Sequence, residues 1–157
     1  MRGLFSASMR VDFYHLQTSP LDRALPQLLE RVLKSGERAV VMASSEDRVD
    51  ALANMLWTFN PGSWLPHGTS KDGFPDKQPV YLTDKEENPN GARFLVLTDG
   101  MSSSDMAAFD RCLDIFDGNH DESVIGARQR WSTAKAAGHE LHYWQQTETG
   151  WAEKVSS

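Results

Sequence analysis

Apolar residues recur along this chain with two different spacings, and each spacing predicts one kind of element. Apolar or alternating runs typical of buried strands occupy residues 9–15, 38–43, 80–83, 94–98, 113–116 and part of 139–147. Helical spacing, with serine, proline or glycine at the ends, predicts helices over 20–35, 45–57, 102–112 and 121–138. Residues 58–79 are rich in proline, glycine and asparagine and are expected to form a loop, and NPNG at 88–91 is a turn sequence.

Strands that alternate with helices predict a mainly parallel sheet whose two faces are covered. The expected fold is a single three-layer Rossmann-like α/β domain over residues 9–147. The strands at 80–83 and 94–98 fit either a hairpin or an addition at the sheet edge. Residues 1–8 are expected to be a disordered leader or to precede the native start codon, and the polar tail at 148–157 is expected to fray.

The segment 121–138 has the clearest helical signature in the sequence. It carries acidic residues in its first turn, a lysine in its last turn and a glycine beyond its end, which is the order that the helix dipole favours. One stripe of this helix carries an apolar residue, two cations and a tryptophan, namely Val124, Arg128, Trp131 and Lys135. An aromatic ring between two cations fits two interpretations: long side chains at the edge of a core, or a clamp for an acidic peptide with an aromatic end.

Composition narrows the class of partner. The 157 residues include 24% charged and 39% hydrophobic side chains, which fits one ordinary globular domain. The formal net charge of −6 argues against an extended nucleic-acid-binding surface, because phosphate contacts need clustered lysine and arginine. A local basic patch on such a body would select a small acidic partner. The single cysteine, Cys112, favours a reducing, cytoplasmic setting, and no apolar run approaches the roughly 20 residues of a membrane span.

Sequence motifs for nucleotide, nucleophile and metal chemistry are missing. There is no GxxxxGKS/T loop, and HLQTSP rather than GxGxxG follows the first strand, so no phosphate cradle is expected. There is no GxSxG elbow. His139 and His142 would point to opposite faces of one strand, and no HExxH spacing occurs. We therefore expect no cofactor and no metal, and a Rossmann-like fold that serves as a scaffold.

The best enzyme-like pattern is a pair of carboxylates. Asp99 and Asp117 are predicted to follow two strands of the sheet, and open α/β sheets bind ligands at the carboxyl ends of their strands. Such a pair can hold Mg²⁺ or act as a general acid and base. The alternative function is thus a small magnesium-dependent phosphotransferase or hydrolase. Both residues also precede glycine in turn sequences, and turn chemistry alone accounts for them.

Large aromatic residues and prolines are concentrated at residues 57–67. Trp57 ends the apolar face of the second predicted helix, where a tryptophan is more often core than contact. Trp64 and Pro66 lie on the following loop, whose prolines stiffen the backbone. Trp64 is a candidate for an exposed anchor, because tryptophan is enriched among the residues that dominate protein–protein interfaces.

Four segments of the sequence, taken in order, carry a family signature. They are MRVDFYHL near the start, SGERAVVMASSED, LWTFNPGSWLPH and ARQRWSTAKAAGHEL near the end. Together they resemble the chi subunit family of bacterial DNA polymerase III, a clamp-loader accessory protein, over about residues 9–146. The resemblance implies a noncatalytic Rossmann-like domain without nucleotide, and a role in DNA replication in which DNA is contacted only indirectly.

The resemblance also implies a partner for the stripe. Members of the family bind the acidic C-terminal tail of single-stranded-DNA-binding protein, which ends in an apolar-aromatic pair. On this reading Arg128 is the candidate for the terminal carboxylate of the tail. Trp131 would line the pocket for the terminal ring, and Lys135 would pair with acidic residues further upstream.

A second implied partner is the psi subunit, which links chi to the clamp loader. The stretch that contains Trp57, Trp64 and Pro66 resembles the chi surface used for psi. We therefore expect this stretch to contact psi or another clamp-loader subunit, and we expect no membrane partner.

The sequence departs from the family pattern around the stripe. Family members often carry more basic residues there, whereas Val124 and Ser132 stand at neighbouring positions in this chain. This departure predicts weaker electrostatic attraction, or a tail that is held more by its apolar end. Arg130 points about 100° away from Trp131 around the helix and is not expected in the contact.

Overall fold

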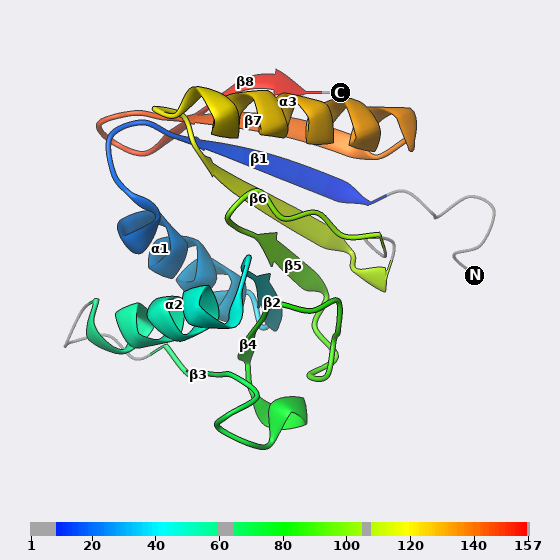
Figure 1. The fold of residues 1–157 in the computed structure, drawn as a ribbon. Coiled ribbons are helices and arrows are strands. Elements are labelled where there is room, and N and C mark those ends of the chain that lie inside the picture. Colours follow the sequence, from blue (N-terminus) through cyan, green and yellow to red (C-terminus); the bar gives the residue numbers. More distant parts are fainter. Residues whose placement is uncertain (1–8, 60–64, 105–107, 157) are drawn as a thin grey trace.

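The structure, a computed structural model, describes residues 9–59, 65–104 and 108–156 and consists of one sheet with helices on both sides (Figure 1). Eight strands make up the sheet: β1 (Arg10–Leu16), β2 (Ala39–Met42), β3 (His67–Gly68), β4 (Val80–Thr83), β5 (Phe94–Leu97), β6 (Arg111–Asp117), β7 (Glu140–Gln146) and β8 (Trp151–Ser156). The described residues also form three α-helices and a short 3-10 helix: α1 (Leu21–Lys34), α2 (Glu46–Thr58), α3 (Asp121–Ala136) and Pro75–Lys77.

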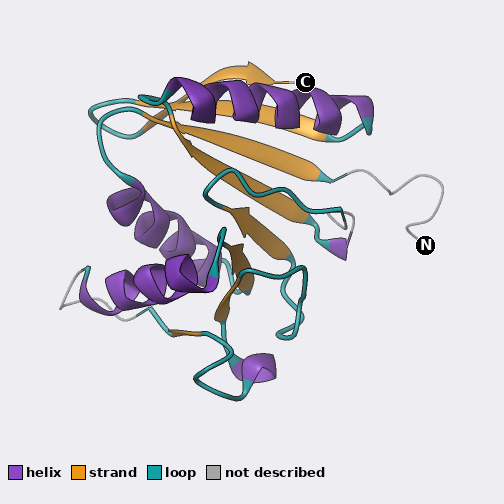
Figure 2. Cartoon of the chain, viewed as in Figure 1, coloured by secondary structure: helices purple, strands orange, loops and turns teal. Residues whose placement is uncertain are grey.

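The sheet is parallel except at one edge. Its strand order is β3-β4-β2-β5-β6-β1-β7-β8, and every neighbouring pair is parallel apart from β7 and β8. Parallel neighbours need crossover connections, and α1 and α3 supply two of them, from β1 to β2 and from β6 to β7 (Figure 2). The predicted single α/β domain with a mainly parallel sheet is confirmed.

Two hydrophobic cores lie on opposite faces of the sheet. Helices α1 and α2 cover one face, where their buried leucines and valines pack on β1, β2 and β6. Helix α3 covers the other face, over β6, β1 and β7. Successive strand residues point to opposite faces, so Phe13 belongs to the core under α3 and Tyr14 to the core under α1 and α2. None of the helices in the described segments is long and apolar enough to cross a membrane.

The predicted start and stop signals lie at or within one residue of the helix ends. Ser45 caps α2, because its hydroxyl oxygen accepts a hydrogen bond from the backbone N–H of Arg48 at 3.1 Å. Pro20 is the N-cap of α1 rather than its first helical residue, so that helix starts one residue later than predicted. Gly36 follows α1 with a φ of +83°, a left-handed conformation that glycine adopts without strain.

The helix predicted over 102–112 is wrong. Cys112 lies fully buried inside strand β6 rather than at a helix end, and the described residues 101–104 are not helical. The backbone N–H and the hydroxyl of Ser104 both donate to the carboxylate of Glu86, at 2.7 and 2.6 Å. Strand β6 lies between β5 and β1 and is paired on both sides, which explains why it runs longer than the predicted 113–116.

The hairpin considered for β4 and β5 is wrong as well. Strand β2 lies between them and pairs in parallel with both, so that Val40 is opposite Tyr81 on one side and Leu95 on the other. Asn90, in the predicted turn, helps the chain cross from β4 to β5. Its Nδ2 donates to the backbone carbonyls of Gln78 and Ala39, at 2.8 and 3.2 Å.

Two segments expected to be irregular contain strands. Residues 148–157, expected to fray, include β8, which pairs antiparallel with β7. Trp151 gives this polar segment an apolar anchor, because its ring meets that of Tyr14 edge-on at 5.0 Å between centroids. The expected loop at 58–79 contains β3, which pairs with β4, and the 3-10 helix. The leader at 1–8 lies outside the described residues.

Candidate binding site on helix α3

Helix α3 forms where the sequence predicts it, from Asp121 to Ala136. Its first turn carries two acidic side chains and its last turn carries Lys135, so charged groups at both ends oppose the helix dipole. Gly138 follows the helix with a φ of +84°, as a terminating glycine does. The predicted boundary signals of this helix are therefore confirmed.

The predicted stripe divides between core and solvent. Val124 and Trp131 are half-buried and pack on the core beneath α3. Arg128 and Lys135 are exposed. Two buried alanines of α3 face the sheet and allow the helix to approach it closely. Trp131 thus lies at the edge of the core, with an exposed cation before and after it on the stripe, as the first interpretation expects. The clamp interpretation stays a prediction.

Trp131 belongs to a cluster of aromatic rings that reaches across three strands. Its ring centroid lies 5.3 Å from that of Phe13 on β1 and 5.9 Å from that of Tyr143 on β7. The Tyr143 ring lies 6.0 Å from Phe116 on β6 and 5.7 Å from the imidazole of His15 on β1. The rings meet at tilted or edge-on angles, which the quadrupole of an aromatic ring favours.

Sequence reasoning missed Tyr143 and His15 as members of this site. Alternation along β1 places His15 on the same face as Phe13, and that much was available from the sequence. The pairing of Phe13 with Tyr143 depends on β7 lying beside β1, and no local pattern states which strands are neighbours.

The positive charge of Arg128 acts on two members of the cluster. Burial lowers the pKa of His15 and the charge of Arg128 lowers it further, while a backbone hydrogen bond to Gly118 and the charge of Asp117 act the other way. Burial raises the pKa of the Tyr143 hydroxyl, and Arg128 opposes that rise. Arg128 is therefore close enough to act electrostatically on both rings.

His15 is held between Tyr143 and Gly118. Its Nδ1 makes a hydrogen bond with the Tyr143 hydroxyl. Its Nε2 side lies so close to Gly118 that a β-carbon there would come within 1.9 Å of the ring. A glycine is thus required at this position by the close approach of the imidazole, and not only by the turn that the sequence indicates.

Arg130 faces away from the stripe, as the helical spacing predicts. Its Nε and Nη2 donate to the carboxylate of Asp114 on β6, at 2.6 and 3.0 Å. Asp114 is only 2% exposed, and a buried carboxylate needs such a paired donor. Arg130 therefore connects α3 to β6, and its guanidinium is already bound to a carboxylate of this chain.

The second predicted surface is only partly described. Trp57 is 60% exposed, so the interpretation of this residue as core is wrong, although the rest of the apolar face of α2 is buried. Its ring packs at 4.4 Å between centroids on the imidazole of His67, which is buried in β3. Pro66 is half-buried, and Trp64 lies outside the described residues.

Asp99 and Asp117 do line one cleft of about 750 Å³ at the carboxyl ends of the strands. Asp99 accepts hydrogen bonds from Nη2 and Nε of Arg48 at 2.9 and 3.1 Å and from the backbone N–H of Ser44 at 3.1 Å. Burial would raise its pKa, but these donors outweigh burial and lower it. No group of three or more metal-ligating side chains occurs in the described part of the chain. The magnesium hypothesis therefore loses its support, because Arg48 already neutralises Asp99.

In the loop between β1 and α1, three backbone N–H groups bind a side chain of the protein itself. The backbone N–H groups of Gln17, Thr18 and Ser19 all point at Oε1 of Gln146, at 2.9, 2.9 and 3.1 Å. Nucleotide-binding Rossmann domains hold phosphate at this place. Here the neutral side-chain oxygen of Gln146, on β7, accepts from these three N–H groups. The Nε2 of the same side chain donates to the Ser19 hydroxyl at 2.6 Å.

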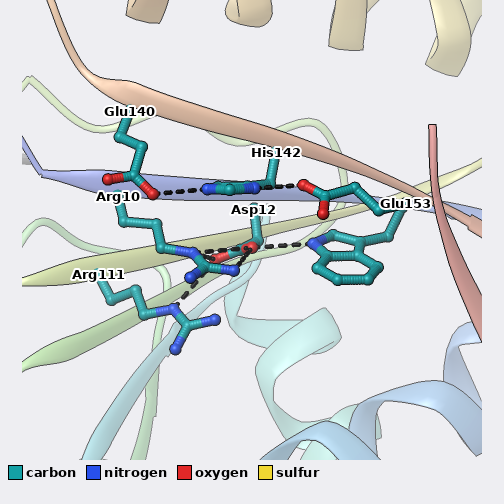
Figure 3. Close-up of polar contacts among 7 residues, drawn as sticks. Arg10, Asp12, Arg111, Glu140, His142 and Glu153 are labelled. Carbon is teal, nitrogen blue, oxygen red and sulfur yellow. Dashed lines mark hydrogen bonds and ion pairs between the residues drawn. The ribbon is translucent and has the colours of Figure 1, made fainter. Parts of the chain in front are cut away.

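A network of charged side chains lies on the sheet face opposite α3 (Figure 3). The fully buried Asp12 accepts hydrogen bonds from Arg10, Arg111 and the Trp144 indole at 2.9 to 3.2 Å. Above it in Figure 3, His142 bridges two glutamates on β7 and β8. These bonds connect β6, β1, β7 and β8 and give the network a structural role.

Comparison with known proteins agrees with the family signature in the sequence. The model of the DNA polymerase III chi subunit, HolC, matches residues 9–142. A curated relative, the probable DNA polymerase III subunit chi of Rickettsia prowazekii (strain Madrid E), is 33% identical over 94 residues, which are 60% of this chain and 55% of that protein. The match thus spans about half the length of the curated relative.

The family match includes the strands and helices that form the site, from β1 through α3 to the start of β7. It leaves out β8 and most of the β7 segment that carries Tyr143. Chi subunits are noncatalytic accessory subunits of the replicative polymerase. This chain belongs to the DNA polymerase III chi subunit family.

Proposed function

We propose that the chain is a replisome accessory subunit that docks the acidic C-terminal tail of single-stranded-DNA-binding protein on helix α3. The observation that carries the proposal is the exposed Arg128 beside the half-buried ring of Trp131. A tail that ends in an aromatic residue presents a ring and a carboxylate on the same terminal residue. A guanidinium next to an aromatic edge is the complementary pair of groups.

Each residue of the stripe has a separate task in this proposal. Arg128 donates charge-assisted hydrogen bonds to the terminal carboxylate. Trp131 and Val124 offer the apolar surface against which the terminal ring packs. Lys135, one helical turn further on, attracts the acidic residues that precede it and raises the association rate.

The test is calorimetry with an acidic peptide that ends in a free-carboxylate phenylalanine. Arg128→Ala should weaken binding by roughly 1.5–3 kcal/mol, the range for hydrogen bonds to charged groups, and amidation of the peptide terminus should do the same. Arg23→Ala, at an exposed arginine on α1, is the matched control because it changes the net charge equally. Unchanged affinity in both Arg128→Ala and the amidated peptide would rule out the carboxylate role.

We further propose that the surface around Trp57, Trp64 and Pro66 binds psi or another clamp-loader subunit. The support is the exposure of Trp57, because a tryptophan at 60% exposure loses contact with water when a partner covers it. With the tail on α3 and a clamp-loader subunit on this surface, the chain would link single-stranded-DNA-binding protein to the polymerase. Its contact with DNA would then be indirect, and its place would be the bacterial cytoplasm.

A further inference from the structure

His15 is a titratable side chain within the aromatic cluster beneath helix α3, where it contacts Tyr143. We propose that binding of the tail carboxylate beside Arg128 is coupled to protonation of His15, and that the Tyr143 hydroxyl then turns from His15 to the carboxylate. The inference rests on the proposed tail binding. It adds two residues to the site and makes the affinity depend on pH.

Two contacts of His15 frame the proposal: the Nε2 side of the imidazole faces Gly118, and Nδ1 is hydrogen-bonded to the Tyr143 hydroxyl. A neutral imidazole has one donor and one acceptor nitrogen. In the proposed resting state the ring carries its proton on Nε2, so that Nδ1 is the acceptor and receives the O–H of Tyr143. In this state the phenol presents only lone pairs to an incoming carboxylate.

Protonation reverses the direction of the bond between the two rings. One proton passes from solvent to Nδ1 of His15, which then donates to the Tyr143 oxygen. The phenol keeps its own proton and becomes free to donate it to an anion. The site then offers a guanidinium, a phenolic O–H and a nearby imidazolium, which together suit a carboxylate better than Arg128 alone.

The charges that face His15 explain why the proton would arrive with the ligand. Arg128, from α3, opposes protonation, whereas Asp117, from β6, favours it; Tyr143, from β7, is neutral. Burial is the largest effect and keeps the pKa of the imidazole below its ordinary value, so the free protein holds a neutral ring at neutral pH. A carboxylate on Arg128 offsets this opposing charge and thereby favours protonation of the imidazole.

The first test is calorimetry of the full chain with the free-carboxylate peptide between about pH 5.5 and about pH 8, in buffers with different ionisation enthalpies. Uptake of one proton raises the affinity by up to about tenfold for each pH unit of acidification, and the heat then depends on the buffer. A flat profile with buffer-independent heat would overturn the coupling while leaving tail binding intact. Absence of binding at every pH would overturn tail binding itself, and the coupling with it.

Two variants test whether the proton that is taken up on binding resides on His15. His15→Gln and Tyr143→Phe should still bind the peptide but should lose the rise in affinity at acid pH. His139→Gln is the matched control, because His139 is another histidine whose pKa is lowered by burial, and it follows the far end of α3. It should keep the pH dependence of the native chain. An undiminished rise in His15→Gln would overturn the assignment.

A measurement on the native chain avoids any loss of folding in the variants. The ring protons of His15, followed by NMR through a pH titration, should report a higher pKa with the peptide than without it. An identical titration curve in the two samples, at peptide concentrations that saturate the site, would overturn the proposal. The same titration on Arg128→Ala without peptide should also show a raised pKa, because one opposing charge is gone.

Discussion

At the scale of single residues, Asp12 is a buried carboxylate whose charge depends on donors from three other side chains. It is fully buried, and two guanidinium groups and an indole N–H surround its carboxylate. Asp12→Asn removes the charge and leaves Arg10 and Arg111 without their anion. Both arginines are about one-third exposed, so water can solvate them in part and the expected loss in the free energy of unfolding is about 1–3 kcal/mol.

Urea unfolding measures this loss. Asp84→Asn is the control, because Asp84 is an exposed acid and the substitution is the same; surface changes of this kind stay within about 0.5 kcal/mol. Equal unfolding midpoints for the two variants would contradict the structural role of Asp12. The tail site should remain intact, since Asp12 lies on the sheet face opposite α3.

Single residues also show how far the sequence predicts the site. Helical spacing alone placed Arg128, Trp131 and Lys135 near one another, because positions along one helix have fixed angles. The bond between His15 and Tyr143 joins residues 128 positions apart. It depends on the order of strands in the sheet, and that order follows from the packing of the whole chain rather than from local spacing.

At the scale of elements, β8 is the feature that local patterns failed to predict. Its sequence is polar, and its attachment comes from Trp151, which packs on Tyr14, and from Glu153, which reaches His142 on β7. The helix wrongly predicted at 102–112 has a related cause. Serines that cap helices also donate to carboxylates, as Ser104 does to Glu86, and only the tertiary structure decides between these uses.

Trp151→Ala should therefore destabilise the β7–β8 edge of the sheet. The ring is half-buried, so the expected cost is about 1–3 kcal/mol, below the range for fully buried aromatics. Thermal unfolding and hydrogen exchange of the β7 amides would measure it, with the exposed Lys154→Ala on the same strand as control. Exchange of the β7 amides as slow as in the native chain would show that Trp151 does not hold the strand.

At the scale of the whole molecule, the two proposed surfaces lie at different ends of the sheet. Trp57 packs on His67 in β3, the first strand in the sheet order. Helix α3 lies over β6, β1 and β7, towards the opposite edge and on the opposite face from α2 (Figure 1). If each proposed surface binds its own partner, both partners could be held at once, because the two surfaces share no residue.

This arrangement predicts that the two surfaces act independently. Trp57→Ala should change the affinity for the tail peptide by less than about twofold, because distant sites without shared contacts are additive. It should weaken binding of a psi-like subunit by at least about tenfold, as loss of an interface tryptophan does. Arg128→Ala should give the reverse pattern. Titrations of both single variants and the double variant with each partner measure the coupling, and a Trp57→Ala protein that loses the tail as fully as Arg128→Ala would mean that the two surfaces are one.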